Sequence, residues 1–462
     1  PLSLGYSSNN FSQKFTYDAT DQLSFYANGG YYNRGLERPV EREDITGGSK
    51  YNTAYEGYNW GAGAKYKLSK RNVIQFDYSG NNYASRYKYL IENSGYLPGQ
   101  YALTKLQKFH DAELKGIFGF TTNSTTVFGV DYRREVLRRP DSDLDKSVYT
   151  TSAYGQHEVK LWNHLTGVVG VRYDHHEQTG GRFTPKVAAM YNIGNFNVRA
   201  TYAAGFRAPG IDELYYHMFK KTMGTRATIS LGDENLDPER SNYYSINMEY
   251  RTNRFSASVT GYLNYVKNMV TSKSTKFDDL PEAEQNQLRE EFPEIGDLSS
   301  TKNLSVKNYF NFEKATVKGF EVNLNGNLFP GFTLAGNYTY AYGRGLNEGG
   351  EWQNIERSIR HTATITGNYT HSWSDYTLNL NLNGRLQSKV YYPGDADGNA
   401  PGYGIWNFNT RHTFDGFRNF IIEPGIGIDN IFNKKDNRPL NKNFALYSPG
   451  RSVVISLALR LK

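Results

Sequence analysis

Long stretches of alternating apolar and polar residues recur along the whole chain, and they restrict the possible folds more than any other feature. In Tyr376–Gln387 the side chains at 376, 378, 380, 382 and 386 are apolar, and most of the others are amides or hydroxyls. A β-strand places successive side chains on opposite faces, so each stretch predicts a strand with one apolar and one polar side. Strands of soluble proteins average about five or six residues. Alternation over about ten or more residues, repeated from residue 2 to residue 461, is typical of a transmembrane antiparallel β-barrel with a polar lumen.

The composition fits this all-β class and excludes others. Aromatic residues make up 15% of the 462 residues, which suits the two aromatic girdles of a membrane barrel. Mean hydropathy is −0.68, and no run approaches the ~18 apolar residues of a spanning helix, so a helical membrane protein is excluded. The chain has no cysteine and therefore no disulfide or thiolate site. The net charge of +7 is spread along the chain, and no nucleic-acid-binding module is present.

Short polar turns and long loops alternate along the sequence. The short turns are rich in Gly, Asn, Asp and Ser, as at Gly194-Asn195 and Pro330-Gly331, whereas the longest loops span residues 207–239 and 273–302. Outer-membrane barrels have short periplasmic turns and long extracellular loops. We therefore expect one barrel domain over residues 1–462, with about twenty strands, in the bacterial outer membrane. A hairpin is expected within residues 2–19, and the even count would place both ends on the periplasmic side.

Two short boxes flank the long 207–239 loop. The first is Phe206-Arg207-Ala208-Pro209, and the second is Asn235-Leu236-Asp237-Pro238-Glu239. Proline removes a donor from a strand ladder, so Pro209 and Pro238 should mark the strand ends on either side of the loop. The boxes resemble the "FRAP" and "NPxLxPE" motifs of TonB-dependent outer-membrane receptors. Near the C-terminus, Gly427–Asn433 and Ser448–Arg451 are similar to two further motifs of that family.

The resemblance implies further parts that this chain lacks. Family members have 22 barrel strands and an N-terminal plug that contacts TonB. The chain starts in an apparent strand and has no signal peptide, so we expect a piece of a receptor without the plug and first two strands. The expected partners are the TonB complex through the missing plug, together with lipid and lipopolysaccharide around the barrel.

Candidate ligand residues lie between the two boxes. They are Tyr215, Tyr216, His217 and Met218, together with Arg207 of the first box. In haem-transporting members a histidine of this interval resembles an axial haem ligand, and neutral imidazole is a usual ligand of haem iron. His217 is therefore the candidate iron ligand, and haem is the candidate cargo. The alternative is an aromatic girdle at the base of a loop with an ordinary exposed histidine.

Other polar clusters carry weaker predictions. Asp174-His175-His176-Glu177 has metal-binding residue types, but adjacent strand residues point in opposite directions. Asp141, Asp143 and Asp145 form a possible calcium loop, as do Asp395, Asp397 and Asn399, although both lack a distal glutamate ligand. No intrinsic cofactor is expected. Residues 281–292 predict a helix within an extracellular loop, either as a solubilising cap or as a docking surface for a surface lipoprotein.

The function predicted from these features is TonB-dependent uptake of a scarce, bulky nutrient, with haem or another iron chelate favoured. A siderophore or cobalamin is the alternative cargo. A passive pore or secretion channel is the alternative from a different class, because barrel chemistry alone does not separate a pore from a receptor. The sequence contains no nucleophile elbow, no zinc-protease helix and no phosphate-binding loop, so we do not expect an enzyme.

Overall fold

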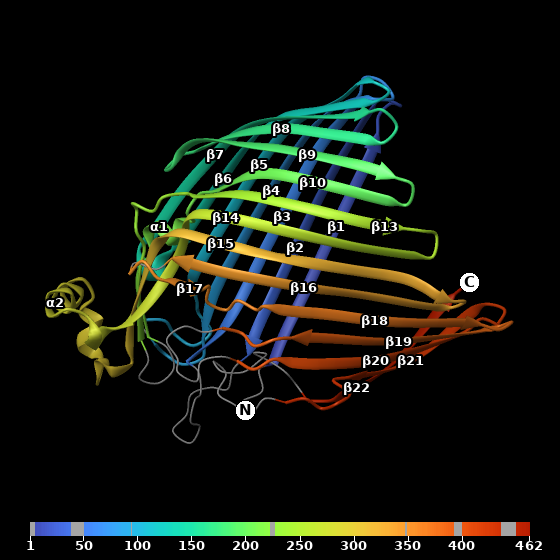
Figure 1. Ribbon diagram of the computed structural model, residues 1–462. Coiled ribbons are helices and arrows are strands. Elements are labelled where there is room, and N and C mark those ends of the chain that lie inside the picture. The colour runs from blue at the N-terminus through green and yellow to red at the C-terminus, as the bar shows by residue number, and fades with distance from the viewer. Residues whose placement is uncertain are drawn as a thin grey trace.

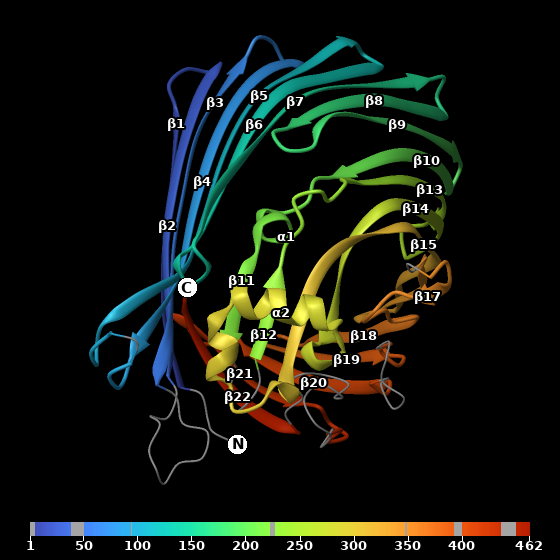
Figure 2. The same ribbon diagram turned by 90° about the vertical axis from the view of Figure 1, so that its left-hand side faces the viewer.

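One continuous β-sheet forms almost the entire molecule. The computed structural model describes residues 5–37, 50–93, 95–221, 227–346, 349–391, 400–435 and 450–462. Across these residues the sheet has 22 strands, and it curves into the wall of a barrel (Figures 1 and 2). No helix within the described ranges is both long enough and apolar enough to cross a membrane.

Nineteen of these 22 strands are long and build the wall. They are β1 (Gly5–Asp18), β2 (Leu23–Glu37), β3 (Tyr51–Lys67), β4 (Asn72–Tyr89), β5 (Tyr101–Thr121), β6 (Ser124–Arg139), β7 (Leu144–Leu161), β8 (Leu165–His176), β9 (Gly180–Ile193), β10 (Phe196–Arg207), β13 (Glu239–Arg251), β14 (Phe255–Lys276), β15 (Leu304–Phe329), β16 (Phe332–Leu346), β18 (His361–Ser372), β19 (Tyr376–Gln387), β20 (Tyr403–Phe414), β21 (Phe420–Asp429) and β22 (Ser452–Leu461). Each pairs antiparallel with its neighbours along the wall, and β10 pairs with β13 across the longest connection, residues 208–238. The predicted antiparallel barrel is confirmed.

Short elements lie in the loops. They are the strands β11 (His217–Lys221), β12 (Ala227–Leu231) and β17 (Trp352–Asn354), the helices α1 (Ile211–Tyr215) and α2 (Glu282–Glu291), and the 3-10 turns η1 (Pro140–Ser142), η2 (Phe277–Asp279), η3 (Pro293–Asp297) and η4 (Thr301–Asn303). The helix predicted over 281–292 is thus present as α2. Strand β12 pairs with β15 in parallel, in contrast to the antiparallel wall.

The predicted hairpin within residues 2–19 is wrong, because Gly5–Asp18 is a single strand. Its turn-prone residues Ser8, Asn9 and Asn10 are all paired with β2, and Asn9 donates to the Asn33 side chain over 3.2 Å. Nineteen wall strands make an odd count, so β1 starts at the end of the barrel with the long loops and β22 finishes at the end with the short turns (Figure 1). The prediction that both lie on the periplasmic side is therefore also wrong.

The two edge strands of the wall do not pair with each other in the described residues. Strand β1 pairs with β2, and β22 pairs with β21. Every residue of both strands is exposed.

The two faces of the wall have the chemistry that the alternation predicts. On the outward face, Leu382 of β19 is opposite Phe408 of β20, and many large apolar side chains such as Ile455, Leu457 and Leu459 are exposed. Hydrocarbon side chains in this position are suited to lipid. At the short-turn end, stacked aromatic pairs such as Phe118–Phe128 and Phe329–Phe332 form a girdle, with ring centroids 5.1 and 4.8 Å apart.

The inward face carries charged and amide side chains. Arg172 bonds to Asp131 and Asp174, and Tyr154 donates to Glu113 over 2.7 Å. On the other side of the barrel the amides of Asn381 and Asn383 bond to Asn368 and Thr366. Polar groups are thereby satisfied by one another across neighbouring strands, which is the arrangement expected of a lumen.

Candidate functional site

The two sequence boxes lie side by side at the extracellular end of the wall. Strand β10 ends where β13 begins, and Arg207 is paired with Glu239 in the ladder between them. The 31 residues from 208 to 238 therefore leave and return at adjacent points. Pro209, Leu236 and Pro238 are buried in this region, whereas Asn235 is exposed.

Arg207 is the centre of an ionic cluster that joins the two boxes. Its Nη1 donates to Glu213 Oε2 over 2.9 Å, and its Nη2 donates to Glu239 Oε1 over 2.6 Å. Glu213 also accepts the backbone N–H of Gly210, and Glu239 accepts that of Val270 in β14. One guanidinium thus ties together β10, α1, β13 and β14. The structure gives Arg207 a bonding role within the loop base, while ligand contact by Arg207 stays a prediction.

Helix α1 fixes the candidate ligand residues against the wall. Its Ile211 packs with Leu137, Leu144 and Val148 of β6 and β7. Its Leu214 packs with Leu236 of the second box and Val270. Five residues make little helix by themselves, so these two apolar contacts supply the stability of α1.

Tyr215 and Tyr216 follow in half-buried positions. The Tyr216 hydroxyl accepts a 2.9 Å hydrogen bond from Arg139 Nη1, and the Lys146 ammonium lies 4.7 Å from the centre of the Tyr215 ring. Burial raises the pKa of both phenols above the usual value of 10.0. Both tyrosines therefore stay neutral at physiological pH and offer hydrogen bonds and ring faces rather than phenolate ligands.

His217 is the most accessible of the predicted ligand residues. Its side chain is 55% exposed, and Nε2 lies 3.5 Å from a carboxylate oxygen of Glu291. Its ring stacks on Phe292 with centroids 4.4 Å apart. The next residue, Met218, is 7% exposed. Alternation along β11 thus separates the accessible imidazole from the buried thioether.

The loop that carries His217 belongs to a small folded module, which we call the loop module (β11, β12, η2, α2, η3 and the start of β15). Its core contains the fully buried Phe277, Ile229 and Val306, packed with Leu288 of α2 and Ile295 of η3. Figure 2, viewed toward the loop end, shows β11, β12 and α2 lying across the barrel mouth. His217, the first residue of β11, therefore belongs to a module that lies at the barrel mouth.

The positions of the acidic side chains do not support the weaker predictions of metal sites. Asp141 is paired with Arg139, Asp145 is paired with Arg138, and Asp174 is held by Ser152 and Arg172. Within the part of the chain that the structure describes, no three His, Asp or Glu side chains converge on a metal position. Calcium binding remains a prediction, and Asp395, Asp397 and Asn399 lie outside the described residues, as do Ser448 and Pro449.

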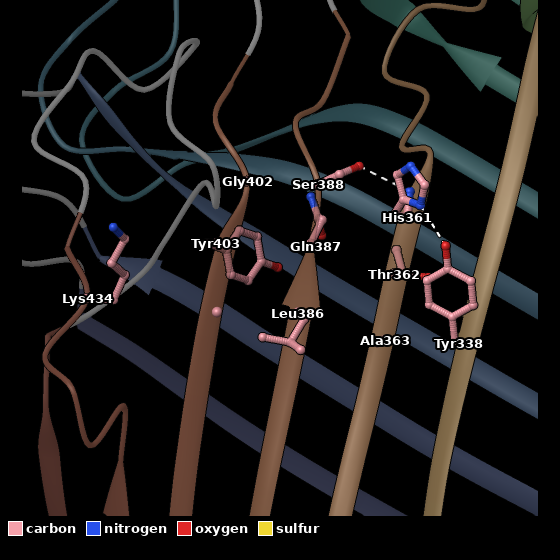
Figure 3. Close-up of a pocket in the computed structure, with 11 residues that line it drawn as sticks. Tyr338, His361, Thr362, Ala363, Leu386, Gln387, Ser388, Gly402, Tyr403 and Lys434 are labelled. Carbon is pink, nitrogen blue, oxygen red and sulfur yellow. Dashed lines mark hydrogen bonds between the residues drawn. The ribbon is translucent and has the colours of Figure 1, made fainter. Parts of the chain in front are cut away.

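A hollow of about 580 Å³ lies elsewhere, on the outward face at the loop ends of β16, β18, β19 and β20 (Figure 3). The Tyr338 hydroxyl bonds to His361 Nδ1 over 2.7 Å at one side of it. In the ladders Tyr338 lies opposite Ala363, and Ala363 opposite Leu386, on the same face as the lipid-facing Leu382. This hollow therefore faces away from the lumen and from any path through the barrel.

The family follows from comparison with known proteins. The sequence profile described as "TonB dependent receptor-like, beta-barrel" matches residues 1–431. The chain belongs to the TonB-dependent receptor β-barrel family. This assignment confirms the predicted family and places the chain in the outer membrane.

Individual relatives are distant. The ferric enterobactin receptor PirA of Pseudomonas aeruginosa is 24% identical over 62% of this chain and 38% of its own length. The vitamin B12 transporter BtuB of Vibrio cholerae is 21% identical over 59% of this chain and 41% of its own length. The chain thus spans about two fifths of these curated relatives. None of these relatives is an enzyme by name, in agreement with the prediction from motifs.

Solved structures of receptors share the fold. The crystal structure of a ferric enterobactin receptor variant (PfeA, R480A) from Pseudomonas aeruginosa with enterobactin superimposes with a TM-score of 0.73 at 16% identity. The match covers 100% of this chain and 71% of that one. The siderophore receptor PirA gives a TM-score of 0.69, with 99% and 71% covered. At these identities the likeness concerns the barrel architecture.

Several residues of the site were not predicted from the sequence. Glu213, Arg139, Glu291 and Phe292 contact the predicted residues from other elements. Glu213 has a local signal, because it stands at the third position of a helix whose first backbone N–H it accepts. The others come from loops 70 or more residues away, and no local pattern marks them.

Proposed function

We propose that the protein takes up an iron chelate across the outer membrane, powered by TonB, and that haem is its cargo. The observation that carries this proposal is the position of His217. An imidazole that is 55% exposed is held by a folded loop module over the mouth of a receptor-family barrel. Neutral imidazole is a usual ligand of haem iron.

The surroundings of His217 suit a metal ligand. A carboxylate beside one ring nitrogen orients a metal-binding imidazole and raises its basicity, and Glu291 lies 3.5 Å from Nε2. Phe292 adds a ring face beside the imidazole. Tyr215 and Tyr216 lie next in the chain, with cations beside both rings.

Ferric enterobactin is the second candidate cargo, because two relatives in Pseudomonas aeruginosa are ferric enterobactin receptors by name. Cobalamin is the third, on the basis of the vitamin B12 transporters among the relatives. Neither of these cargoes requires an imidazole ligand from the protein.

Absorption titration of the full-length receptor separates these cargoes. With haem, we expect a Soret band shifted by coordination, and the His217→Ala variant should lose that shift while its barrel assembles normally. The matched control is His175→Ala, another histidine at the extracellular end of the wall. Haem binding with an unchanged Soret band in His217→Ala would remove His217 from the site. Saturable binding of ferric enterobactin or cobalamin without haem binding would reassign the cargo.

A further inference from the structure

Five tyrosines share the lumen face near the extracellular ends of β2, β3 and β4. We call this set the tyrosine panel: Tyr32, Tyr51, Tyr55, Tyr83 and Tyr87. In the ladders Tyr32 and Tyr83 both lie opposite Gly57, and Tyr87 lies opposite Thr53. Because alternate residues of a strand share a face, all five belong to one side of the wall.

A contact deeper in the barrel identifies that side as the lumen. The Tyr26 hydroxyl of β2 donates to Asp77 of β4 over 2.6 Å, on the polar inward face. Tyr32 is six residues from Tyr26 on the same strand, and Tyr83 is six residues from Asp77. The register irregularity in this region falls between Ser85 and Arg86 in the β4–β5 ladder, whereas the β3–β4 register continues without a shift. Even spacing along unbroken strands keeps the tyrosine panel on the inward face.

A lipid girdle does not account for these rings. Girdle aromatics point outward, as Tyr31 and Tyr58 do on the opposite face of the same strands, with ring centroids 5.0 Å apart. The chain therefore places separate tyrosine sets on the two faces at the same height. The inward set calls for a different explanation.

Four rings of the tyrosine panel pack on one another in two stacked pairs. Tyr51 and Tyr87 stack with centroids 3.8 Å apart and planes 26° apart, and Tyr55 and Tyr83 lie 6.1 Å apart at 22°. Tyr32 covers Gly57, where an added Cβ would come within 3.3 Å of its ring. All five rings are half-buried, so packing fixes their orientation and part of each remains open to the lumen.

Two cationic side chains lie on either side of the tyrosine panel, in one row of residues across the sheet. Arg34 of β2 lies opposite Tyr55, Tyr55 lies opposite Ser85, and Ser85 lies opposite Lys105 of β5. Adjacent strands are about 4.8 Å apart, so the two cations stand on either side of the Tyr55–Tyr83 pair at roughly three strand spacings. The Arg34 guanidinium lies 5.1 Å from the centre of the Tyr6 ring, and among the described residues neither Arg34 nor Lys105 is paired with a carboxylate.

The tyrosine panel is linked to the candidate ligand residues. Tyr87 lies within electrostatic reach of Arg139, the last residue of β6, and of Asp141 in η1. Arg139 in turn donates to Tyr216 and lies 5.3 Å from the centre of its ring. Aromatic and cationic groups thus extend from the tyrosine panel to the base of the loop that carries His217.

We propose that the tyrosine panel, with Arg34 and Lys105, is a stacking subsite for an aromatic acid. Its ligand carries a flat aromatic ring and ionised acidic groups at the ring edge. Rings fixed by packing gain contact with a flat ligand at little entropic cost, and the cations receive its acidic groups. The proposal deepens the uptake function and rests on it for the biological cargo. Stacking itself requires no iron. A porphyrin with carboxylates and a catecholate chelate both have this chemistry.

Fluorescence titration of the full-length receptor in detergent tests the proposal with two probes, metal-free protoporphyrin IX and ferric enterobactin. Tyr55→Leu/Tyr83→Leu should raise the Kd of at least one probe about tenfold, the scale expected for losing a well-placed aromatic contact. Tyr55→Phe/Tyr83→Phe should restore binding, because it keeps the rings. The matched control is Tyr31→Leu/Tyr58→Leu on the outward face, which should leave both Kd values unchanged. The responding probe identifies the source of the ligand.

A charge variant and a comparison of two probes complete the test of the subsite. Arg34→Gln/Lys105→Gln should also weaken binding and reduce its salt dependence, and it serves as the test if the leucine pair does not assemble. Metal-free protoporphyrin IX has no iron, so its binding reports on the tyrosine panel, whereas the Soret shift with haem reports on coordination by His217. Failure of the uptake proposal at His217 is therefore distinguishable from failure of the subsite. Unchanged Kd values for both probes in the inward variants would overturn the subsite.

Discussion

At the residue scale, the ion cluster of Arg207 explains why the two boxes carry the residue types they do. A guanidinium has five N–H donors in a fixed fork, so it can bind two carboxylates at once. Glu213 and Glu239 take those positions from opposite ends of the loop. These ion pairs hold both ends of the 31-residue loop, residues 208–238, at one point of the barrel wall.

Replacing Arg207 by alanine should therefore loosen the loop and leave the barrel assembled. Arg207 is 45% exposed, so solvent screening reduces the loss to about 1–2 kcal/mol. That corresponds to amide exchange about tenfold faster in residues 208–221. The control is Arg240→Ala, one residue beyond the cluster on β13. Exchange that is equally slow in both variants would show that the apolar contacts alone hold the loop.

The sequence predicted the two boxes, but it could not show which contacts each of their side chains makes. Arg207 was expected among ligand-binding residues, and the structure adds its ion pairs with Glu213 and Glu239, while ligand contact stays a prediction. Met218 was also expected beside the ligand; it is buried, and its contact with a ligand stays a prediction. The ion pair with Glu239 and the burial of Met218 depend on contacts between segments that are distant in the sequence, which residue spacing does not encode.

At the scale of elements, the alternation determined the wall strands because lipid and water select opposite faces of every strand. The alternating stretch Tyr376–Gln387 is β19, and the expected turns Gly194-Asn195 and Pro330-Gly331 join β9 to β10 and β15 to β16. The pattern failed at β1, where a hairpin was expected but Gly5–Asp18 pairs with β2 as one strand. The loop module was predicted only as the helix over 281–292, because its core joins two separate loops and the start of β15.

Lipid-facing leucines of β19 provide the test of the wall. Leu380→Arg should destabilise the barrel by about 2–4 kcal/mol if it lies near the bilayer midplane. Asn381→Arg, one residue along and facing the lumen, should cost much less. Urea unfolding in lipid vesicles measures both. Equal destabilisation by the two variants would contradict the assigned faces.

The loop module should unfold separately from the wall. Phe277 is fully buried in its core, so Phe277→Ala should cost about 3–5 kcal/mol of the module's stability. Hydrogen exchange should rise over residues 280–306 and stay unchanged in β4 to β8. Glu290→Ala on the exposed side of α2 is the control. A rise in exchange across the wall strands would show that module and barrel fold as one unit.

At the scale of the whole molecule, a barrel in the outer membrane carries a folded module over its mouth and an accessible imidazole on that module. A passive pore needs only the first of these. A haem receptor of the proposed kind uses all three, because the cargo must be bound outside before it is moved inward.

The most direct test of this account is growth on haem as the only iron source, in cells whose other haem receptors have been deleted. The full-length receptor should support growth at low haem concentration, and growth should be lost in His217→Ala and in cells without TonB. Immunoblots of outer membranes confirm equal amounts of each variant. Growth that persists without TonB, or that is unaffected by His217→Ala, would contradict active uptake of haem through this site.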